Sequence, residues 1–269
     1  MAEKTDFAIR YGPWAIVAGA SQGLGAAYAE ELAARGLNVV LLARRGELLQ
    51  SLASKLSTKH HVETRTIVLD LSAADAAEQV AQATNDLEIG LLVYNAAFSA
   101  IGRFLERPLD DHLKELETNT FTPLKLIHLF AGQMLLRGCG GIVLMSSLSA
   151  FQGSAYISAY AATKAFNIVL AEGLWEEWRA QGVDVLVCVS GAVRTPNYLA
   201  SEPERTGGLG DMTMAPEQVA REALDSLGKG PYVIPGRMNR MSSFVMRHLL
   251  PRRMTVKFMG RILRRMYVE

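Results

Sequence analysis

Seven short apolar runs, each of strand length, alternate along the chain with longer segments in which apolar residues recur at helical spacing. This alternation is typical of βαβ units, whose crossover helices cover both faces of a parallel sheet. The predicted strands are 14–18, 38–43, 64–69, 91–95, 142–146, 183–189 and 232–234, and the predicted helices are 24–35, 46–57, 72–85, 109–137 with a break near Asn119, 158–180 and 216–228. The sequence therefore predicts an α/β protein with a doubly wound, seven-stranded parallel sheet and helices on both faces.

Charge is distributed unevenly along the chain. The formal net charge is +1, yet residues 237–269 hold nine Lys and Arg residues against one acid, Glu269. We therefore divide the chain into an α/β domain, 1–236, and a basic helical C-terminal tail, 237–269. Apolar residues at helical spacing on both sides of Pro251 predict two amphipathic helices separated by a break. Their apolar faces can pack on the domain or a partner subunit and help to cover a pocket, or the last helix can lie in an anionic membrane interface.

Several classes of protein are excluded. No apolar run reaches the roughly 18 uncharged residues of a spanning helix, and the N-terminus lacks the basic start of a secretory signal. Cys139 and Cys188 lie in apolar surroundings without metal-ligand spacing, as expected of reduced thiols in a cytosolic protein. The basic tail has few aromatic residues and no nucleic-acid-binding motif. We expect a cytoplasmic protein without a metal site or a nucleic-acid partner, whose contact with membranes, where it occurs, is peripheral and through the tail.

A glycine-rich turn follows the first predicted strand and leads into a helix. It has Gly19, Gly23 and Gly25 in the pattern G-x-x-x-G-x-G, together with Ser21 and Leu24. Glycines let the backbone approach a pyrophosphate, and the helix N-terminus offers free N–H groups and the positive end of the helix dipole. The turn is the expected site of a dinucleotide's phosphates; the alternative is a tight βα turn that binds nothing.

The ends of the second and third strands are predicted to select the dinucleotide. Arg44 and Arg45 stand where a carboxylate would bind the adenosine ribose and repel a 2′-phosphate. Guanidinium groups attract that phosphate, which favours NADP(H); the alternative is a pair of surface arginines without a ligand. Asp70 and Leu71 end the third strand where the adenine is expected, although an Asp there can also cap a helix and Ser72 is the better capping candidate.

A serine at the end of the fifth strand and a Tyr–Lys pair in the next helix form the most specific constellation. Tyr160 and Lys164 are four residues apart and therefore share one helix face, and Ser147 precedes Tyr160 by thirteen residues. An adjacent ammonium is expected to lower the pKa of the phenol, so that Tyr160 can exchange a proton with a substrate alcohol or ketone. Ser147 would hydrogen-bond the same substrate oxygen as charge develops on it.

Together these residues resemble the motifs of the short-chain dehydrogenase/reductase family over about residues 14–235. Asn95 and Ala96 match the motif after the fourth strand, and Val193 and Thr195 match the motif after the sixth. The resemblance implies a Rossmann-type fold and an NADP(H)-dependent oxidoreductase. By resemblance, the catalytic residues are Asn119, Ser147, Tyr160 and Lys164, and the cofactor contacts are Gly19, Ser21, Gly23, Leu24, Gly25, Arg44, Arg45, Asp70, Leu71, Asn95, Ala96, Tyr160, Lys164, Val193 and Thr195.

The resemblance also implies roles. Asn119 would anchor a proton-relay water chain with Lys164, whose ammonium would also hold the nicotinamide ribose, while Val193 and Thr195 would hold the nicotinamide carboxamide and the phosphates. Three positions depart from the family pattern without removing a reacting group: Ala18 for Thr, Ala97 for Gly and Ser190 for Pro.

Within the family, the chain looks most like bacterial NADP-dependent hydroxysteroid dehydrogenases. The candidate substrate contacts are Phe98, Leu148, Gln152, Tyr156 and Tyr198. They are mostly apolar or aromatic, which suits a lipophilic or cyclic, steroid-like substrate, and core packing is the alternative for each. The family further implies a homodimer or homotetramer. A catalytically silent, nucleotide-binding regulator or scaffold is the alternative function, and the presence of all four catalytic residues argues against it.

Overall fold

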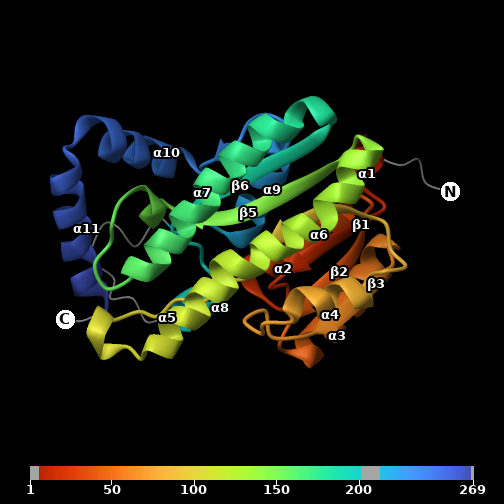
Figure 1. The fold of residues 1–269 in the computed structure, drawn as a ribbon, viewed down its shortest axis with the longest axis horizontal. Coiled ribbons are helices and arrows are strands. Elements are labelled where there is room, and N and C mark those ends of the chain that lie inside the picture. Colours follow the sequence, from red (N-terminus) through yellow and green to blue (C-terminus); the bar gives the residue numbers. More distant parts are fainter. Residues whose placement is uncertain (1–5, 201–212, 268–269) are drawn as a thin grey trace.

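The computed structural model describes residues 6–200 and 213–267. Its centre is a seven-stranded sheet in the order β3-β2-β1-β4-β5-β6-β7, with every neighbouring pair parallel (Figure 1). The strands are β1 (Trp14–Ala18), β2 (Asn38–Ala43), β3 (Thr64–Val68), β4 (Ile89–Tyr94), β5 (Gly140–Ser147), β6 (Val183–Ser190) and β7 (Tyr232–Val233). The predicted doubly wound sheet is confirmed, and the strand order reverses between β1 and β4.

Helices cover both faces of the sheet, as predicted. Helices α2 (Gly23–Ala34), α3 (Gly46–His60) and α9 (Pro216–Ser226) lie on one face, and α4 (Ala76–Ala83), α6 (Thr122–Arg137) and α7 (Ser158–Trp178) lie on the other. Alternate strand residues project to opposite faces. In β1, Ala15 and Val17 pack against the first set of helices, whereas Ile16 and Ala18 pack against the second. The central strands are apolar throughout because both of their faces are covered.

The structure differs from the predicted elements at three short segments. Helices α1 (Asp6–Tyr11) and α8 (Pro196–Ala200) are too short to show an apolar period in the sequence. Helix α4 begins at Ala76 and not at residue 72, because the Asp70 carboxylate accepts hydrogen bonds from the N–H and hydroxyl groups of Ser72 and holds a turn there. The prediction that Ser72 caps this helix is wrong. Residues 201–212, which precede α9, lie outside the described residues.

The predicted break in the helix over 109–137 is confirmed. Helix α5 (Leu109–Leu116) passes through a π-helical turn, η2 (Glu117–Phe121), into α6 without leaving the helical conformation. A π-turn accommodates one more residue than an α-helical turn and leaves a carbonyl in need of a partner. The Thr120 hydroxyl donates a hydrogen bond to the carbonyl of Leu116. Asn119 lies within this turn, fully buried.

The basic tail forms two helical segments, as predicted. Helix α10 (Arg237–Phe244) continues into a π-helical turn over Val245–Leu249, and α11 (Arg252–Tyr267) follows after an extended residue, Leu250. Figure 1 shows both helices at the end of the molecule remote from α1, with α11 beside the segment that precedes α7. The tail therefore lies at the same end of the molecule as the start of the helix that carries Tyr160 and Lys164.

The apolar residues of the tail are only partly buried. Helix α10 turns Asn239 and Ser243 inward and leaves Met241 and Phe244 exposed. Helix α11 buries Leu263, but Phe258, expected on the same apolar side, is 49% exposed. In the single chain the domain therefore leaves the apolar face of α10 exposed and covers that of α11 in part, and packing on a partner subunit stays a prediction. Among the helices of the described ranges, none is long and apolar enough to cross a membrane.

Candidate active site

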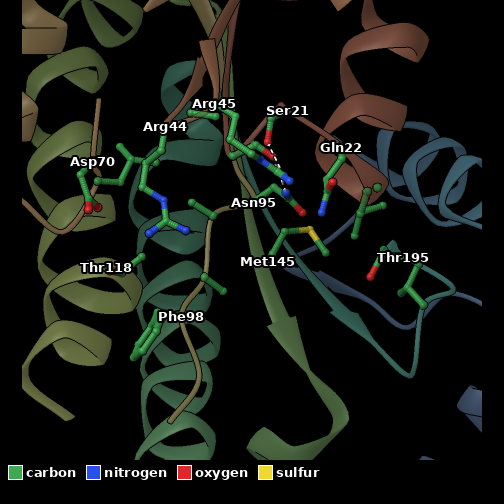
Figure 2. A pocket seen from close by; sticks show the side chains of 18 of the residues that line it. Ser21, Gln22, Arg44, Arg45, Asp70, Asn95, Phe98, Thr118, Met145 and Thr195 are labelled. Atoms are coloured by element: carbon green, nitrogen blue, oxygen red, sulfur yellow. Dashed lines mark hydrogen bonds between the residues drawn. The ribbon is translucent and has the colours of Figure 1, made fainter. Parts of the chain in front are cut away.

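A cleft of about 290 Å³ opens at the carboxyl ends of the strands, at the reversal of strand order (Figure 2). Ligands of doubly wound sheets bind at this point. Every residue predicted to contact the cofactor lines the cleft, apart from Gly25, which packs beneath Gly19. The lining thus includes Gly19, Ser21, Gly23, Leu24, Arg44, Arg45, Asp70, Leu71, Asn95, Ala96, Tyr160, Lys164, Val193 and Thr195.

The glycine-rich turn is packed too closely for side chains. Gly19 has a φ of +82°, and a Cβ there would lie 2.8 Å from the Ala96 Cα atom. A Cβ on Gly25 would lie 2.0 Å from the Gly19 carbonyl oxygen, which also accepts a hydrogen bond of 3.1 Å from the Asn95 amide. The turn is therefore pressed against the end of β4, and the N-terminus of α2 is left open towards the cleft.

Two arginines stand at the adenosine end of the cleft. Figure 2 shows Arg44 extending beside Asp70, and the Arg45 guanidinium donates a hydrogen bond of 2.9 Å to the Ser21 hydroxyl of the glycine-rich turn. Partial burial opposes ionisation of Asp70, but hydrogen bonds from Ser72 and the charges of Lys114 and Arg44 outweigh it, so the pKa of this carboxyl is lower than usual. Both arginines are exposed.

Tyr160 and Lys164 line the other end of the cleft, and Ser147, which is not among the lining residues, ends β5 beside Tyr160. Helix α7 carries Tyr160 and Lys164, with the Lys164 Nζ atom 5.5 Å from the centre of the Tyr160 ring. Lys164 is 3% exposed and donates a hydrogen bond of 3.1 Å to the Met145 carbonyl on β5. The Ser147 hydroxyl accepts hydrogen bonds from the N–H and hydroxyl groups of Ser149 and is also hydrogen-bonded to Tyr160.

The environment of Tyr160 and Lys164 shifts both pKa values. Burial raises the pKa of Tyr160 to about 12, the negative charge of Glu115 adds to the rise, and the hydrogen bond with Ser147 opposes it. Burial lowers the pKa of Lys164 to about 8, and Glu115 opposes this change. The expected lowering of the tyrosine pKa is not seen, because burial dominates and the ammonium is directed at the Met145 carbonyl. A tyrosine that is protonated at neutral pH suits the donation of a proton.

Asn119 is placed to fix the backbone beside the cleft. Its amide donates a hydrogen bond of 2.8 Å to the Phe98 carbonyl and one of 3.1 Å to the Thr163 hydroxyl, and its oxygen accepts one of 2.9 Å from the Phe98 N–H. These contacts join the segment after β4 to α7, one residue before Lys164. The proposed water relay between Asn119 and Lys164 stays a prediction.

Comparison with known proteins decides the family. The family model for short chain dehydrogenase matches residues 13–205. The chain belongs to the short-chain dehydrogenase family. A 7beta-hydroxysteroid dehydrogenase of Clostridium sardiniense is 34% identical to this short-chain dehydrogenase over 235 residues, 87% of this chain and 90% of the relative. A very-long-chain 3-oxoacyl-CoA reductase of Mus musculus is 38% identical over 180 residues, 65% of this chain and 58% of that protein.

Solved structures agree with this assignment. A structure from work on 7beta-hydroxysteroid dehydrogenase stereoselectivity superposes with a TM-score of 0.89 at 32% identity, covering 95% of this chain and 99% of that one. A short-chain dehydrogenase from Sphingobium yanoikuyae in complex with NADPH superposes with a TM-score of 0.76 at 27% identity, covering 87% and 92%. This short-chain dehydrogenase is thus an oxidoreductase of a family that uses nicotinamide cofactors, and the predicted likeness to hydroxysteroid dehydrogenases is confirmed.

The candidate substrate contacts of this dehydrogenase separate in the structure. Phe98 lines the cleft. Leu148 packs against the core, and Gln152, which is 6% exposed, donates a hydrogen bond to the Leu148 carbonyl and lines a second cavity beside the tail. The Tyr156 hydroxyl accepts a hydrogen bond of 3.0 Å from Arg264 on α11. Phe98 is therefore the candidate that the cleft supports, and Gln152 is directed elsewhere.

The tail of the dehydrogenase brings a further group to the substrate end. Burial raises the pKa of both Tyr160 and Tyr198, and the negative charge of an ionised Tyr267 would raise each pKa further. The last turn of α11 is therefore within the range of an electrostatic interaction with both. Sequence analysis missed Tyr267 because nothing in a basic amphipathic helix shows which of its residues will reach a site formed by α7.

Other cleft residues also have no sequence signal. Lys114 on α5 has its Nζ atom 3.9 Å from an Asp70 oxygen and 5.4 Å from the centre of the Phe98 ring. It lies 44 residues from Asp70 in the sequence, and only the packing of α5 brings the two together. The remaining lining residues adjoin predicted motifs: Gln22, Ala43, Leu69, Ala97, Thr118, Met145, Ser146 and Ser190. Within the described ranges, no three His, Cys, Asp or Glu side chains are grouped as a metal site requires.

Proposed function

We propose that this short-chain dehydrogenase uses NADP(H) to interconvert a secondary alcohol and a ketone on a lipophilic or cyclic, steroid-like molecule. One observation carries the proposal: a single cleft has Arg44 and Arg45 at one end and Tyr160 and Lys164 at the other, with the glycine-rich turn between them. A dinucleotide phosphorylated on the adenosine ribose matches this distribution of charge along the cleft.

The residues at the adenosine half fit such a cofactor. The glycine-rich turn has no room for a Cβ at Gly19 or Gly25, so its backbone can meet a pyrophosphate directly. Arg44 and Arg45 would bind the 2′-phosphate, and no Asp or Glu stands at the end of β2 to repel it. Arg45, already hydrogen-bonded to Ser21, would link the phosphate to the turn. When bound, the nicotinamide supplies or accepts the hydride.

The chain's own residues supply proton transfer and charge stabilisation. Tyr160, held protonated by burial, would donate its phenolic proton to the ketone oxygen. Ser147, hydrogen-bonded to Tyr160, would donate a hydrogen bond to the same oxygen as negative charge develops there. Lys164 would place a positive charge behind both groups and hold the nicotinamide ribose. Asn119 would keep the Phe98 backbone in place at the cleft.

Two features support the substrate class. Among the similar proteins, one kind is named for hydroxysteroids and another for very-long-chain 3-oxoacyl-CoA, and both names denote lipophilic molecules. Of the candidate substrate contacts, Phe98 lines the cleft and Tyr156 contacts α11, and together with Tyr198 they offer ring surfaces with few polar groups. Apolar pockets with a few placed hydroxyl groups suit cyclic ketones better than sugars or charged acids.

A substrate panel tests the proposal. Steroid ketones, long-chain acyl ketones and small cyclic ketones are each offered with NADPH and with NADH, and oxidation of the cofactor is followed by absorbance. We expect turnover of a steroid or similar lipophilic ketone with NADPH. Binding of NADPH without turnover of any ketone or alcohol would instead support the silent regulator or scaffold.

We further propose that the protein is a homodimer or homotetramer. Apolar side chains that are exposed in the single chain follow one another along α5, α6 and α7: Leu113, Leu124, Leu129, Leu136, Phe166 and Val169. Exposed apolar patches on this scale are typical of interfaces. Light scattering or analytical ultracentrifugation of the full chain measures the state, and a monomer at micromolar concentration would contradict it.

Peripheral contact with an anionic membrane is proposed for the tail. Met241 and Phe244 of α10 and Met254 and Phe258 of α11 are exposed, in a segment with nine basic residues and one acid. Exposed apolar groups among basic residues suit the boundary between headgroups and acyl chains. Vesicle binding and its salt dependence provide the test described below.

A further inference from the structure

Glu115 is a buried carboxylate that the proposed mechanism does not use. Among Asp, Glu, Lys and Arg in the described part of the chain, three side chains are buried: Glu115, Lys164 and Asp184. Asp184 is paired with Arg10 at 2.7 Å, and Lys164 belongs to the active site. A buried ionisable group is costly unless it is paired or functional, so Glu115 requires its own explanation.

Glu115 contacts the backbone that follows β4. It lies on α5, one turn before Asn119, and α5 packs against α7. One carboxylate oxygen, Oε1, accepts a hydrogen bond of 3.2 Å from the Ala100 N–H, while Asn119 holds both backbone groups of Phe98. The two side chains together fix the backbone of residues 98–100, which borders the cleft at Phe98.

The second oxygen of Glu115 lies near an imidazole. His112 Nε2 is 3.1 Å from the Phe104 carbonyl oxygen, and because a carbonyl only accepts, Nε2 carries the hydrogen. In a neutral imidazole Nδ1 is then an acceptor, 3.9 Å from Glu115 Oε2, and neither atom has a hydrogen-bond partner. Oε2 of Glu115 is therefore buried without a hydrogen bond from any described residue to stabilise its charge, which is unusual for a carboxylate oxygen.

The negative charge of Glu115 acts on two residues of the active site. Glu115 disfavours the phenolate of Tyr160 and favours the ammonium of Lys164 on α7. From other elements, the Ser147 hydroxyl at the end of β5 and the Tyr267 hydroxyl on α11 also act on Tyr160. Unlike these hydroxyl groups, the Glu115 carboxylate acts on both Tyr160 and Lys164, although burial raises its own pKa.

We propose that Glu115, together with His112, is a positioning residue that fixes the 98–100 backbone and keeps Tyr160 and Lys164 protonated, extending ketone reduction to higher pH. The inference rests on the proposed oxidoreductase function. It means that one buried carboxylate makes the active site a better proton donor.

The pH dependence of Glu115→Gln tests the charge. Removing the negative charge favours deprotonation of Tyr160 and Lys164. In plots of kcat/KM against pH, alcohol oxidation should therefore begin to rise at a lower pH, and ketone reduction should begin to fall at a lower pH. We expect both shifts to be roughly one pH unit. Glu117→Gln is the matched control. Glu117 begins η2 and forms an ion pair with Lys125 at 2.9 Å, so its replacement should leave both pH profiles unchanged. Coincident pH profiles for Glu115→Gln and the wild type would overturn the proposal.

Glu115→Asp separates the charge from the contact with Ala100. The shorter side chain keeps the negative charge but withdraws from the Ala100 N–H, so we expect the pH profiles of the wild type and an increased KM for the ketone. Profiles shifted as in Glu115→Gln would show that the charge is not the cause and would overturn the inference. If circular dichroism shows that Glu115→Gln does not fold, Glu115→Asp provides the test in its place.

A direct titration of Tyr160 needs no turnover. Tyrosinate absorbance is read after rapid pH jumps, before unfolding, and the signal of the Tyr160→Phe counterpart is subtracted. The midpoint should be lower in Glu115→Gln than in the wild type, and an equal midpoint would overturn the inference. Failure of the proposed function is distinguishable, since it would appear as a wild-type protein that turns over no substrate in the panel.

Discussion

The two ends of the cleft are built in different ways. At the adenosine end, Gly19, Gly25, Arg44 and Arg45 belong to two short segments that directly follow β1 and β2. At the substrate end, Tyr156 meets Arg264 across 108 residues of sequence, and the groups that act on Tyr160 come from α5, β5 and α11. A local segment is set by its own backbone requirements, whereas a site assembled from distant helices depends on how those helices pack.

This difference predicts that substitutions at the adenosine end leave the substrate end unaffected. The adenosine end can be altered at one residue without disturbing the elements that hold Tyr160. The substrate end couples the tail, the segment before α7 and α5, so that one substitution there affects several contacts. The four predictions below test this separation.

Tyr160→Phe should have the largest effect. It removes only the phenolic proton donor, so turnover should fall by ~100-fold to 10,000-fold while NADPH binding is retained. Steady-state kinetics gives the first quantity, and fluorescence titration with NADPH gives the second. Loss of cofactor binding in this variant would show that the two ends are not separable, and residual activity above about a hundredth would show that Tyr160 is not the proton donor.

Ser147→Ala should have a smaller effect on the same step. One hydrogen bond to the substrate oxygen is removed, and the loss in kcat should approach the roughly 100-fold seen when one such donor is lost. Because the Ser147 hydrogen bond also lowers the pKa of Tyr160, the variant should need higher pH for alcohol oxidation. A pH profile of kcat/KM measures this, and an unchanged rate at all pH values would exclude Ser147 from catalysis.

Arg44→Asp tests the adenosine end alone. Each charge-assisted contact with the 2′-phosphate contributes ~1.5–3 kcal/mol, so the wild type should prefer NADPH over NADH more than about tenfold in kcat/KM. The variant should reverse this preference with little change in kcat. Lys55→Asp makes the same change of charge on α3, outside the cleft lining, and should keep the preference for NADPH. Equal use of the two cofactors by the wild type would contradict the proposed selectivity.

Removal of α11 should have the smallest effect on chemistry. A chain ending at Pro251 loses Arg264 and Tyr267, so the KM for a lipophilic ketone should rise several-fold while NADPH binding is unchanged. Arg264→Gln, which cuts the contact with Tyr156 and keeps the helix, should reproduce part of the rise. Changed NADPH affinity in the shortened chain would mean that the tail also supports the adenosine end.

The same pair of chains tests the membrane proposal. The full chain should cosediment with anionic but not with neutral vesicles, and binding should weaken as salt screens the basic residues. The shortened chain should lose this binding. Equal vesicle binding by both chains would refute the membrane proposal, and a simultaneous loss of dimerisation would instead assign the exposed tail residues to a subunit interface.

The sequence predicts most of the sheet and the adenosine end because both depend on local patterns. The residues of β1 are buried on both faces, which produces an unbroken apolar run, and Gly25 is required by an oxygen 2.0 Å from where its Cβ would lie. The outward apolar face of α10 was not predictable, since an apolar stripe does not show which way it turns. Glu115 was missed because one carboxylate in an amphipathic helix has the pattern of a solvated residue, and only packing against α7 buries it.

The π-helical turn over Glu117–Phe121 has a consequence for how the protein can change during evolution. It holds one residue more than an α-helical turn, and Thr120 supplies its own hydroxyl to the carbonyl left over at Leu116. A deletion of one residue here would restore the ordinary repeat of about 3.6 residues per turn and remove the widened turn in which Asn119 lies. Asn119 would then turn away from Phe98. Natural variants of this chain should therefore tolerate substitutions in the turn far better than changes in its length.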